Sequence, residues 1–205
     1  MKHIGNRAGT ALRTGLLAVV LVMVTVSCSQ NPPPISPGQS TAPNATAPES
    51  NPAGDIPDNQ VYVPFTPAGD RFTISVPEGW SRSTAGTETV FTDKYNTVRV
   101  QAGDRAAAPT VESVISQELP GIAAGTPGYR AGTVTAVQRR AGQAVLITYQ
   151  AASAPNPVTG KSVTEAVERY QFWHNGTEVV VTLSGPQGTD NVDPWRTITD
   201  SLQWP

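Results

Sequence analysis

Residues 29–58 form a proline-rich segment that limits how much of this 205-residue chain can enter a packed core. The segment contains eight prolines, and its only large apolar side chains are Ile35 and Ile56. Such a composition buries too little apolar surface to offset the conformational entropy that ordering costs. Because proline favours extended polyproline II geometry, we expect a semi-rigid tether here. The folded part of the chain should therefore begin after it, at about residue 61.

The segment that precedes this tether has the three zones of a secretory signal. Lys2, Arg7 and Arg13 make a basic start, and residues 16–26 are an apolar run of eleven residues. Eleven helical residues reach about 16 Å, roughly half of the ~30 Å hydrocarbon core of a bilayer. The run is therefore too short for a spanning helix and fits the apolar region of a signal peptide. We predict a lipoprotein signal peptide over residues 1–27.

Cys28 is the only cysteine of the chain and follows the apolar run directly. Residues 25–28 (TVSC) resemble the lipobox of bacterial lipoproteins, with Thr25 at the position that leucine usually occupies. The resemblance implies acylation of Cys28, and the two chains of a diacylglycerol suffice for a stable anchor. We expect the protein to sit on the outer face of the cytoplasmic membrane, with residues 28–60 as acylated cysteine and linker. The alternative is a free thiol after an ordinary secretory peptide.

Residues 61–205 show the period-two alternation of β-strands. Phe72, Ile74 and Val76 share one face of a first strand, and residues 88–92 and 96–102 form a predicted hairpin with Val98 and Val100 inward. Four longer strands follow. Their expected ranges are 129–139, 143–152, 165–173 and 177–184. The Asn-Gly pair at 175–176 suits a tight turn between the last two strands.

Two amphipathic helices accompany these strands. The first is expected to begin near Thr110 and to stop at Pro120-Gly121, with residues 121–128 as a loop. The second is expected to have Asp193 as its N-cap and Pro194 at its first position. The prediction is a single α+β domain over residues 61–205. It consists of an antiparallel sheet of about six to seven strands covered by two main helices.

Two motifs connect this domain to a known fold. Residues 69–80 (GDRFTISVPEGW) and residues 195–204 (WRTITDSLQW) resemble the opening strand and the closing helix of the PsbP-like fold. With the lipobox and the tether, the whole chain resembles the actinobacterial LpqN/LpqT lipoprotein group. The resemblance implies a mostly non-catalytic protein associated with envelope lipid binding and trafficking. Both motifs are structural, so they transfer no binding residue to this chain.

Composition excludes several classes of function. The formal charge of −2 argues against a nucleic-acid partner, which requires a clear excess of Lys and Arg. One cysteine and two histidines cannot build a disulfide framework or a Cys/His zinc site. The chain contains no H-E-x-x-H motif, P-loop or G-x-G-x-x-G fingerprint, so no metal site and no cofactor is predicted.

Catalysis has few candidate residues. His174 is the only histidine after the signal peptide, and it flanks a predicted turn without a nucleophile motif such as G-x-S-x-G. Glu165 and Glu168 point to opposite faces of one strand, so they cannot flank a glycosidic bond together. Glu112 and Glu118 are predicted on the solvent side of the first helix. We predict no catalytic residue and no enzyme activity, and a hydrolase is a distant alternative.

A binding site is the better functional hypothesis. Tyr170 and Phe172 share one face of a strand, and Val167 and Trp173 share the other, so one face either packs as core or lines a pocket. The segments 121–128 and 152–161 are candidate rims. The two leading hypotheses are a binding module for an apolar envelope lipid and an accessory protein that stabilises a membrane complex. The sequence identifies no ligand-binding residue for either.

Overall fold

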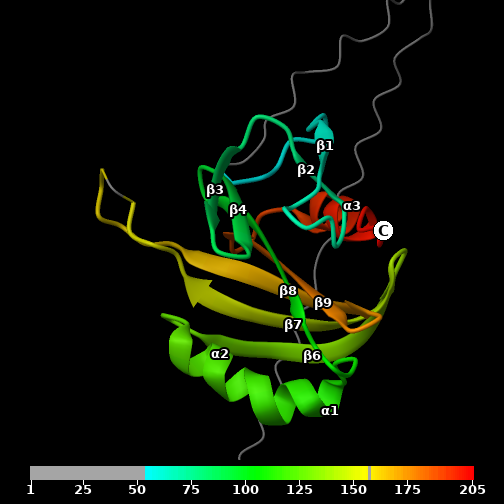
Figure 1. Ribbon diagram of the computed structural model, residues 1–205. Coiled ribbons are helices and arrows are strands. Elements are labelled where there is room, and N and C mark those ends of the chain that lie inside the picture. The colour runs from blue at the N-terminus through cyan, green and yellow to red at the C-terminus, as the bar shows by residue number, and fades with distance from the viewer. Residues whose placement is uncertain (1–53, 157) are drawn as a thin grey trace, which may run out of the picture. The chain divides into compact units, whose positions relative to one another are not determined.

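The computed structural model describes residues 54–156 and 158–205. The predicted signal peptide, Cys28 and the linker up to residue 53 lie outside the described residues. Within the described part, the chain forms one seven-stranded antiparallel sheet and one two-stranded sheet (Figure 1). In the large sheet the strand order is β3-β4-β5-β9-β8-β7-β6, and β1 pairs with β2 in the small one. The strands are β1 (Tyr62–Phe65), β2 (Ile74–Pro77), β3 (Ser81–Ala85), β4 (Glu88–Asp93), β5 (Asn96–Asp104), β6 (Arg130–Arg139), β7 (Gly142–Ala152), β8 (Thr164–His174) and β9 (Thr177–Pro186).

The helices lie on opposite faces of the large sheet. The C-terminal helix α3 (Val192–Asp200) lies with β1 and β2 on one face (Figure 1). On the other face lies a continuous helical segment made of α1 (Val111–Ser113), the π-helix η1 (Val114–Glu118) and α2 (Leu119–Gly125). The predicted class is confirmed: an antiparallel sheet of seven strands is covered by two main helical segments in an α+β fold.

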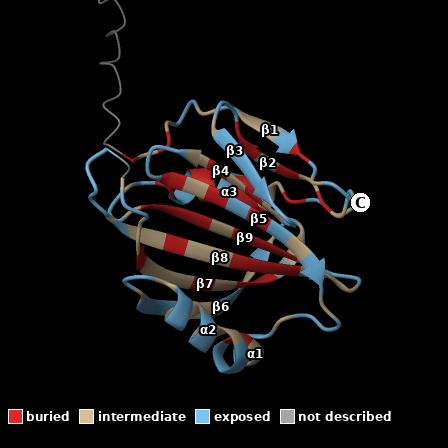
Figure 2. Ribbon diagram, turned by 60° about the vertical axis from the view of Figure 1, so that its left-hand side comes forward, coloured by how far each residue is buried: buried red, intermediate tan, exposed pale blue. Residues whose placement is uncertain are grey.

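Alternation along the central strands builds the main core. Inward residues of β5, β8 and β9 meet the apolar side chains of β2 and α3 in one cluster. Figure 2 shows that buried residues concentrate in α3 and in these central strands. The predicted burial of Trp195, Ile198 and Leu202 in this cluster is confirmed, but α3 ends at Asp200, so Leu202 packs from the segment that follows the helix.

The strands follow the predicted pattern closely. Phe72, Ile74 and Val76 are buried together, and β4 and β5 form the predicted hairpin. The turn between β8 and β9 has positive φ angles at Asn175 (46°) and Gly176 (83°), as a two-residue hairpin turn requires. The exceptions are β1 and β3, which the sequence analysis did not predict. All five residues of β3 are exposed, so no apolar alternation marks it.

The first helix is longer than predicted. Thr110 caps it as expected, since its hydroxyl accepts a hydrogen bond from the amide of Ser113 at 3.1 Å. The predicted stop at Pro120-Gly121 is wrong, because the chain passes through η1 and continues as α2 to Gly125. Pro120 is accommodated at the junction where the π-helical turns of η1 give way to α2, in the first turn of α2. The loop predicted for residues 121–128 is therefore reduced to its last few residues.

The start of α3 also differs from the prediction. Asn191 is the N-cap residue, and Asp193 instead lies in the first turn, where its charge favours the positive end of the helix. Asn191 makes no capping hydrogen bond, because its amide is used elsewhere. Its oxygen accepts a bond from the backbone amide of Ile56 at 2.8 Å, and its nitrogen donates to the carbonyl of Gly54 at 3.2 Å.

These contacts show that packing begins before the predicted boundary at residue 61. Ile56 is only 3% exposed and belongs to the main core cluster. Asn96 also donates from its side chain to the carbonyl of Gly54 at 2.8 Å. Residues 54–56 are thus part of the domain rather than of the tether. Their burial depends on Asn96 and Asn191, which are distant in sequence, so composition alone could not detect it.

Candidate ligand-binding site

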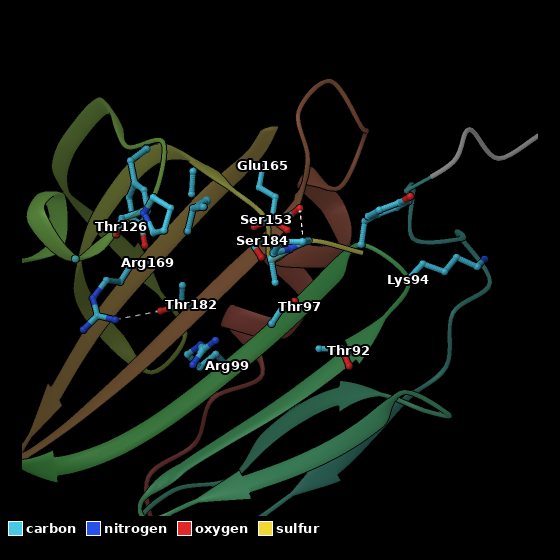
Figure 3. Close-up of a pocket in the computed structure, with 18 of the residues that line it drawn as sticks. Thr92, Lys94, Thr97, Arg99, Thr126, Ser153, Glu165, Arg169, Thr182 and Ser184 are labelled. Carbon is cyan, nitrogen blue, oxygen red and sulfur yellow. Dashed lines mark hydrogen bonds between the residues drawn. The ribbon is translucent and has the colours of Figure 1, made fainter. Parts of the chain in front are cut away.

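An open pocket of about 620 Å³ lies on the face of the large sheet opposite α3. We call it the polar basin. Its floor consists of side chains from three adjacent strands: Thr97 and Arg99 of β5, Thr182 and Ser184 of β9, and Val167 and Arg169 of β8. Figure 3 shows most of these side chains projecting from neighbouring strands into the same space.

The register of the strands explains why these residues meet. Arg99 pairs with Thr182 across β5 and β9, and Thr182 pairs with Arg169 across β9 and β8. Directly opposed residues point to the same face of a sheet, so the three side chains form one row. Because side chains alternate along a strand, the residues between them point into the core. Val98, Val181 and Tyr170 are such neighbours, and each is at most 1% exposed.

Two connecting segments form the walls of the basin. One wall consists of Gly125, the last residue of α2, with Thr126 and Pro127, which follow it, and the other consists of residues 153–156, which follow β7. The walls are joined because the amide of Ala152 donates to the carbonyl of Pro127 at 2.7 Å. Both walls fall within the segments 121–128 and 152–161 that the sequence suggested as rims.

The charges of the basin differ in how they are compensated. Arg99 pairs with Glu88, with 2.6 Å between Nη1 and Oε1. Arg169 donates from Nη1 to the hydroxyl of Thr182 at 3.2 Å, and its Nε is buried without a hydrogen-bond partner. Among the residues that the structure describes, no carboxylate lies within 4.0 Å of the Arg169 guanidinium. Arg169 therefore carries a charge with no counter-charge from the described part of the protein.

Burial shifts the pKa of two further groups that line the basin. Burial raises the pKa of the Tyr149 hydroxyl, and the charges of Arg169 and Arg99 act in the opposite direction. Burial also raises the pKa of the Glu165 carboxyl, while a hydrogen bond with Ser184 opposes the rise. The Tyr149 hydroxyl therefore stays protonated at neutral pH and can donate a hydrogen bond to a ligand.

The helical segment beside the basin is fixed by a charged network. Glu118 accepts hydrogen bonds from the buried amide of Gln171 and from Arg105, which also pairs with Glu178 at 2.6 Å. The prediction that Glu118 is simply solvated is wrong, because its side chain is only 27% exposed and lies between these partners. Val114 completes the attachment by packing on Val145 and Ile147 of β7. The wall formed by the end of α2 is thus held to the sheet.

The remaining candidates from the sequence lie elsewhere. His174 flanks the β8–β9 turn and stacks on the ring of Trp204, with 5.3 Å between the ring centroids. Glu168 lies on the other face of β8 from Glu165 and accepts a hydrogen bond from the hydroxyl of Tyr170 at 2.7 Å. Tyr170 and Phe172 are core residues, whereas Val167 on the opposite face of the strand lines the basin.

Sequence reasoning missed the residues that give the basin its character. Arg169 and Thr182 stand at outward positions of strands that were recognised, and such positions are ordinarily solvated. The signal that marks them is their alignment in one row, which depends on the order β5-β9-β8. No local pattern in the sequence specifies that strand order, so the row could not be recognised.

Two negative findings apply to the described residues. Residues 54–156 and 158–205 contain no group of three or more His, Cys, Asp or Glu side chains placed to hold a metal ion. Over the same residues, no helix has both the length and the apolar character that a membrane crossing needs.

Comparisons with known proteins found no matching family model and no match among curated proteins. Among solved structures, the chain resembles cyanobacterial PsbP from Synechocystis, with 12% identity, a TM-score of 0.49 and coverage of 76% of this chain and 100% of that one. The yeast Ran-binding protein Mog1p, from Saccharomyces cerevisiae, has 13% identity, a TM-score of 0.47 and coverage of 71% and 96%. LpqN of Mycobacterium tuberculosis, described as involved in cell envelope biogenesis, has 16% identity, a TM-score of 0.43 and coverage of 72% and 93%.

The chain spans 48% of the length of a further match, a protein from Bacteroides thetaiotaomicron. PsbP and LpqN, the two resemblances suggested by the sequence motifs, are thus both among these structures, and similarity at this level assigns neither a family nor a function.

Proposed function

We propose that this protein is a membrane-anchored, non-catalytic binding module of the bacterial cell envelope, which captures a ligand in the polar basin. One observation carries the proposal: an open pocket of about 620 Å³ into which charged and hydroxyl side chains converge from three adjacent strands. Small-ligand sites are usually concave and hold a few convergent polar groups, in a lining more apolar than that of the basin.

The chemistry of the basin supports a polar ligand. An enclosed apolar cavity would favour the binding of a lipid chain, whereas this pocket is open and its floor is mostly Arg, Thr and Ser. If the ligand is an envelope lipid, we propose that the basin receives its headgroup. The alternative is an accessory role in a membrane complex, for which the fully exposed edge strand β3 is the candidate docking element.

The absence of catalysis is part of the proposal. The described candidates do not converge: His174 stacks on Trp204, and Glu165 and Glu168 lie on opposite faces of β8. A nucleophile, a base and an orienting group within hydrogen-bond reach are the minimum for covalent catalysis.

The proposed anchor rests on the sequence around Cys28. If Cys28 carries diacylglycerol, the Cys28→Ala variant should move from the detergent phase to the aqueous phase or should accumulate as a precursor. Ser27→Ala is the matched control, because it keeps a small residue before the cysteine, and it should partition like the unmodified protein. A mature Cys28→Ala protein that stays in the detergent phase would rule out acylation at this site.

The proposed site can be tested by blocking it. The full chain, purified from a bacterium that makes it, is examined by native mass spectrometry for a small molecule that stays bound. Ala154→Trp places a large side chain at the rim of the basin and should abolish the bound species. Ala106→Trp, at an exposed position beyond the far end of β5, is the matched control and should retain it. A bound species that survives Ala154→Trp would contradict the site, and a bound protein in its place would favour the accessory role.

A further inference from the structure

The geometry of the polar basin points to the chemical class of its ligand, and this inference rests on the proposed function. We infer that the basin binds a phosphate ester, with the phosphate group held between Arg169 and Arg99 above Thr182. The ester is either the headgroup of a phospholipid or a soluble sugar or glycerol phosphate.

The first argument is the missing counter-charge of Arg169. This guanidinium has one hydrogen bond to a neutral hydroxyl, and no carboxylate of the described residues lies within 4.0 Å of it. The acidic side chain nearest along the same face of β8 is Glu165, four residues away, which corresponds to about 13 Å along a strand. A half-buried cation without a partner costs free energy. A bound anion would supply the partner.

The second argument is the arrangement of donors. Arg99 and Arg169 stand on strands that flank β9, so their backbones are about 10 Å apart at the strand spacing of a sheet. Both side chains are long enough to reach the space above Thr182, which lies between them in the row (Figure 3). Arg99 keeps its ion pair with Glu88 through Nη1, so its other N–H groups are the ones that can contact a ligand. Donors from two directions suit a tetrahedral phosphate with several oxygens. A planar carboxylate is satisfied by one guanidinium fork.

The third argument is the balance of charge. The whole chain carries a formal charge of −2, yet the basin is lined by three cations and one carboxylate, and counting Glu88, which pairs with Arg99, leaves three cations to two carboxylates. The cations are Lys94, Arg99 and Arg169, and the carboxylate is that of Glu165. Lys94 lies at the rim, in the turn between β4 and β5. A local positive potential in an acidic protein attracts anions from solution.

The rest of the basin fits the alcohol part of a phosphate ester. Thr97, Ser184 and Tyr149 add hydroxyl groups around the proposed phosphate position. Each can both donate and accept hydrogen bonds, as recognition of a glycerol or sugar hydroxyl requires. The pocket volume of about 620 Å³ has room for such a group beside the phosphate.

Calorimetric titration of the full chain in a neutral detergent tests this inference. The probes are inorganic phosphate, glycerol phosphate, dihexanoyl phosphatidylglycerol and, as the zwitterionic comparison, dihexanoyl phosphatidylcholine. Binding of inorganic phosphate or glycerol phosphate would identify a soluble ester as the source. Binding of phosphatidylglycerol alone would identify an anionic headgroup. Either result should weaken with added salt, because the contact is between charges.

Three variants test whether the phosphate probe binds at Arg169. Arg169→Gln should weaken the binding of the phosphate probe by about tenfold or more, the usual effect of losing a charge-assisted contact. Thr182→Val, which removes one hydroxyl at nearly constant volume, should weaken it less and guards against misfolding of the first variant. Arg130→Gln removes an equal charge from the opposite face at the edge strand β6 and should change nothing.

Two results would overturn the inference. One is that no phosphate probe binds, and the other is that Arg169→Gln binds the probe as tightly as the unmodified chain. Both are distinguishable from failure of the proposed function. A phosphate-free compound that is lost in Ala154→Trp but kept in Arg169→Gln would preserve the binding module and reject the phosphate.

Discussion

The two faces of the large sheet are built from the same strands and have opposite characters. Towards α3, the central strands present Val98, Tyr170 and Val181, all at most 1% exposed. Towards the basin, the next residues along the same strands are Arg99, Arg169 and Thr182. The comparison separates two roles within one set of strands. Residues on the core face hold the fold together, whereas residues on the basin face are available for a ligand.

The helices reinforce this division. The short helix α3 covers the core face and buries Trp195 and Ile198 there, whereas the segment α1–η1–α2 covers only part of the other face. Its small apolar cluster sits over β7, with Val114 as the buried contact from the helix. The open pocket lies beside it, over β5, β9 and β8. The basin therefore exists because one helical layer is incomplete.

The largest effect is expected on the core face. Trp195→Ala should lower the free energy of unfolding by about 3–5 kcal/mol, because a buried aromatic side chain is removed and a cavity is left. Chemical denaturation measures the change, and Thr197→Ala on the exposed side of the same helix should be nearly neutral. If the Trp195→Ala protein were as stable as the unmodified chain, the burial of Trp195 would not stabilise the core.

The second-largest loss of stability is expected from residues 54–56, which pack on the domain ahead of β1. Asn191→Ala should cost about 1–3 kcal/mol, since it leaves the buried amide of Ile56 without its acceptor and the carbonyl of Gly54 with one donor fewer. A chain shortened to begin at Gln60 should lose a similar or larger amount, because it also loses the burial of Ile56. Asp190→Ala, at an exposed neighbouring position, is the control in the same denaturation experiment. If the shortened chain had the same denaturation midpoint as the full chain, residues 54–56 would not contribute to the stability of the domain.

A smaller effect is expected on the basin face. Arg169→Gln should change the free energy of unfolding by no more than about 0.5 kcal/mol, because the substitution removes a single hydrogen bond to Thr182 and breaks no ion pair among the described residues. A thermal melt of the ligand-free protein provides the measurement. If Arg169→Gln destabilised the protein as much as Trp195→Ala, the division between the two faces would fail.

The smallest effect is a pH dependence from Glu165. Burial raises the pKa of its carboxyl above the unfolded value, so the native state binds the proton more tightly than the unfolded chain does. The contribution to stability is therefore most favourable at acid pH and decreases as pH rises through the folded pKa. Glu165→Gln should be slightly more stable than the unmodified protein at pH 7, and the difference should narrow towards pH 4. A difference that widens towards acid pH would mean that the folded pKa is lowered.

Much of the fold could be predicted from the sequence. Alternation identified the β4–β5 hairpin and the long strands, and the Asn-Gly pair located the β8–β9 turn. The spacing of Trp195 and Ile198 identified the buried side of the last helix. These features depend on neighbours within a few residues along the chain. The edge strand β3 was not predicted, because exposed residues carry no such pattern. The predicted end of the first helix at Pro120 was wrong, because the π-helix η1 places Pro120 in the first turn of α2.

The candidate site was decided by tertiary structure. By itself the sequence determined an α+β class, a polar tether, an expected anchor at Cys28 and two candidate rim segments. It could not determine that Arg99, Thr182 and Arg169 form one row, because that requires β9 to insert between β5 and β8. Nor could it determine that Arg169 lacks a carboxylate partner among the described residues, since ion pairing depends on distances between side chains far apart along the chain. Local patterns specify which face of a strand is apolar, and only the strand order specifies which polar residues meet on the other face.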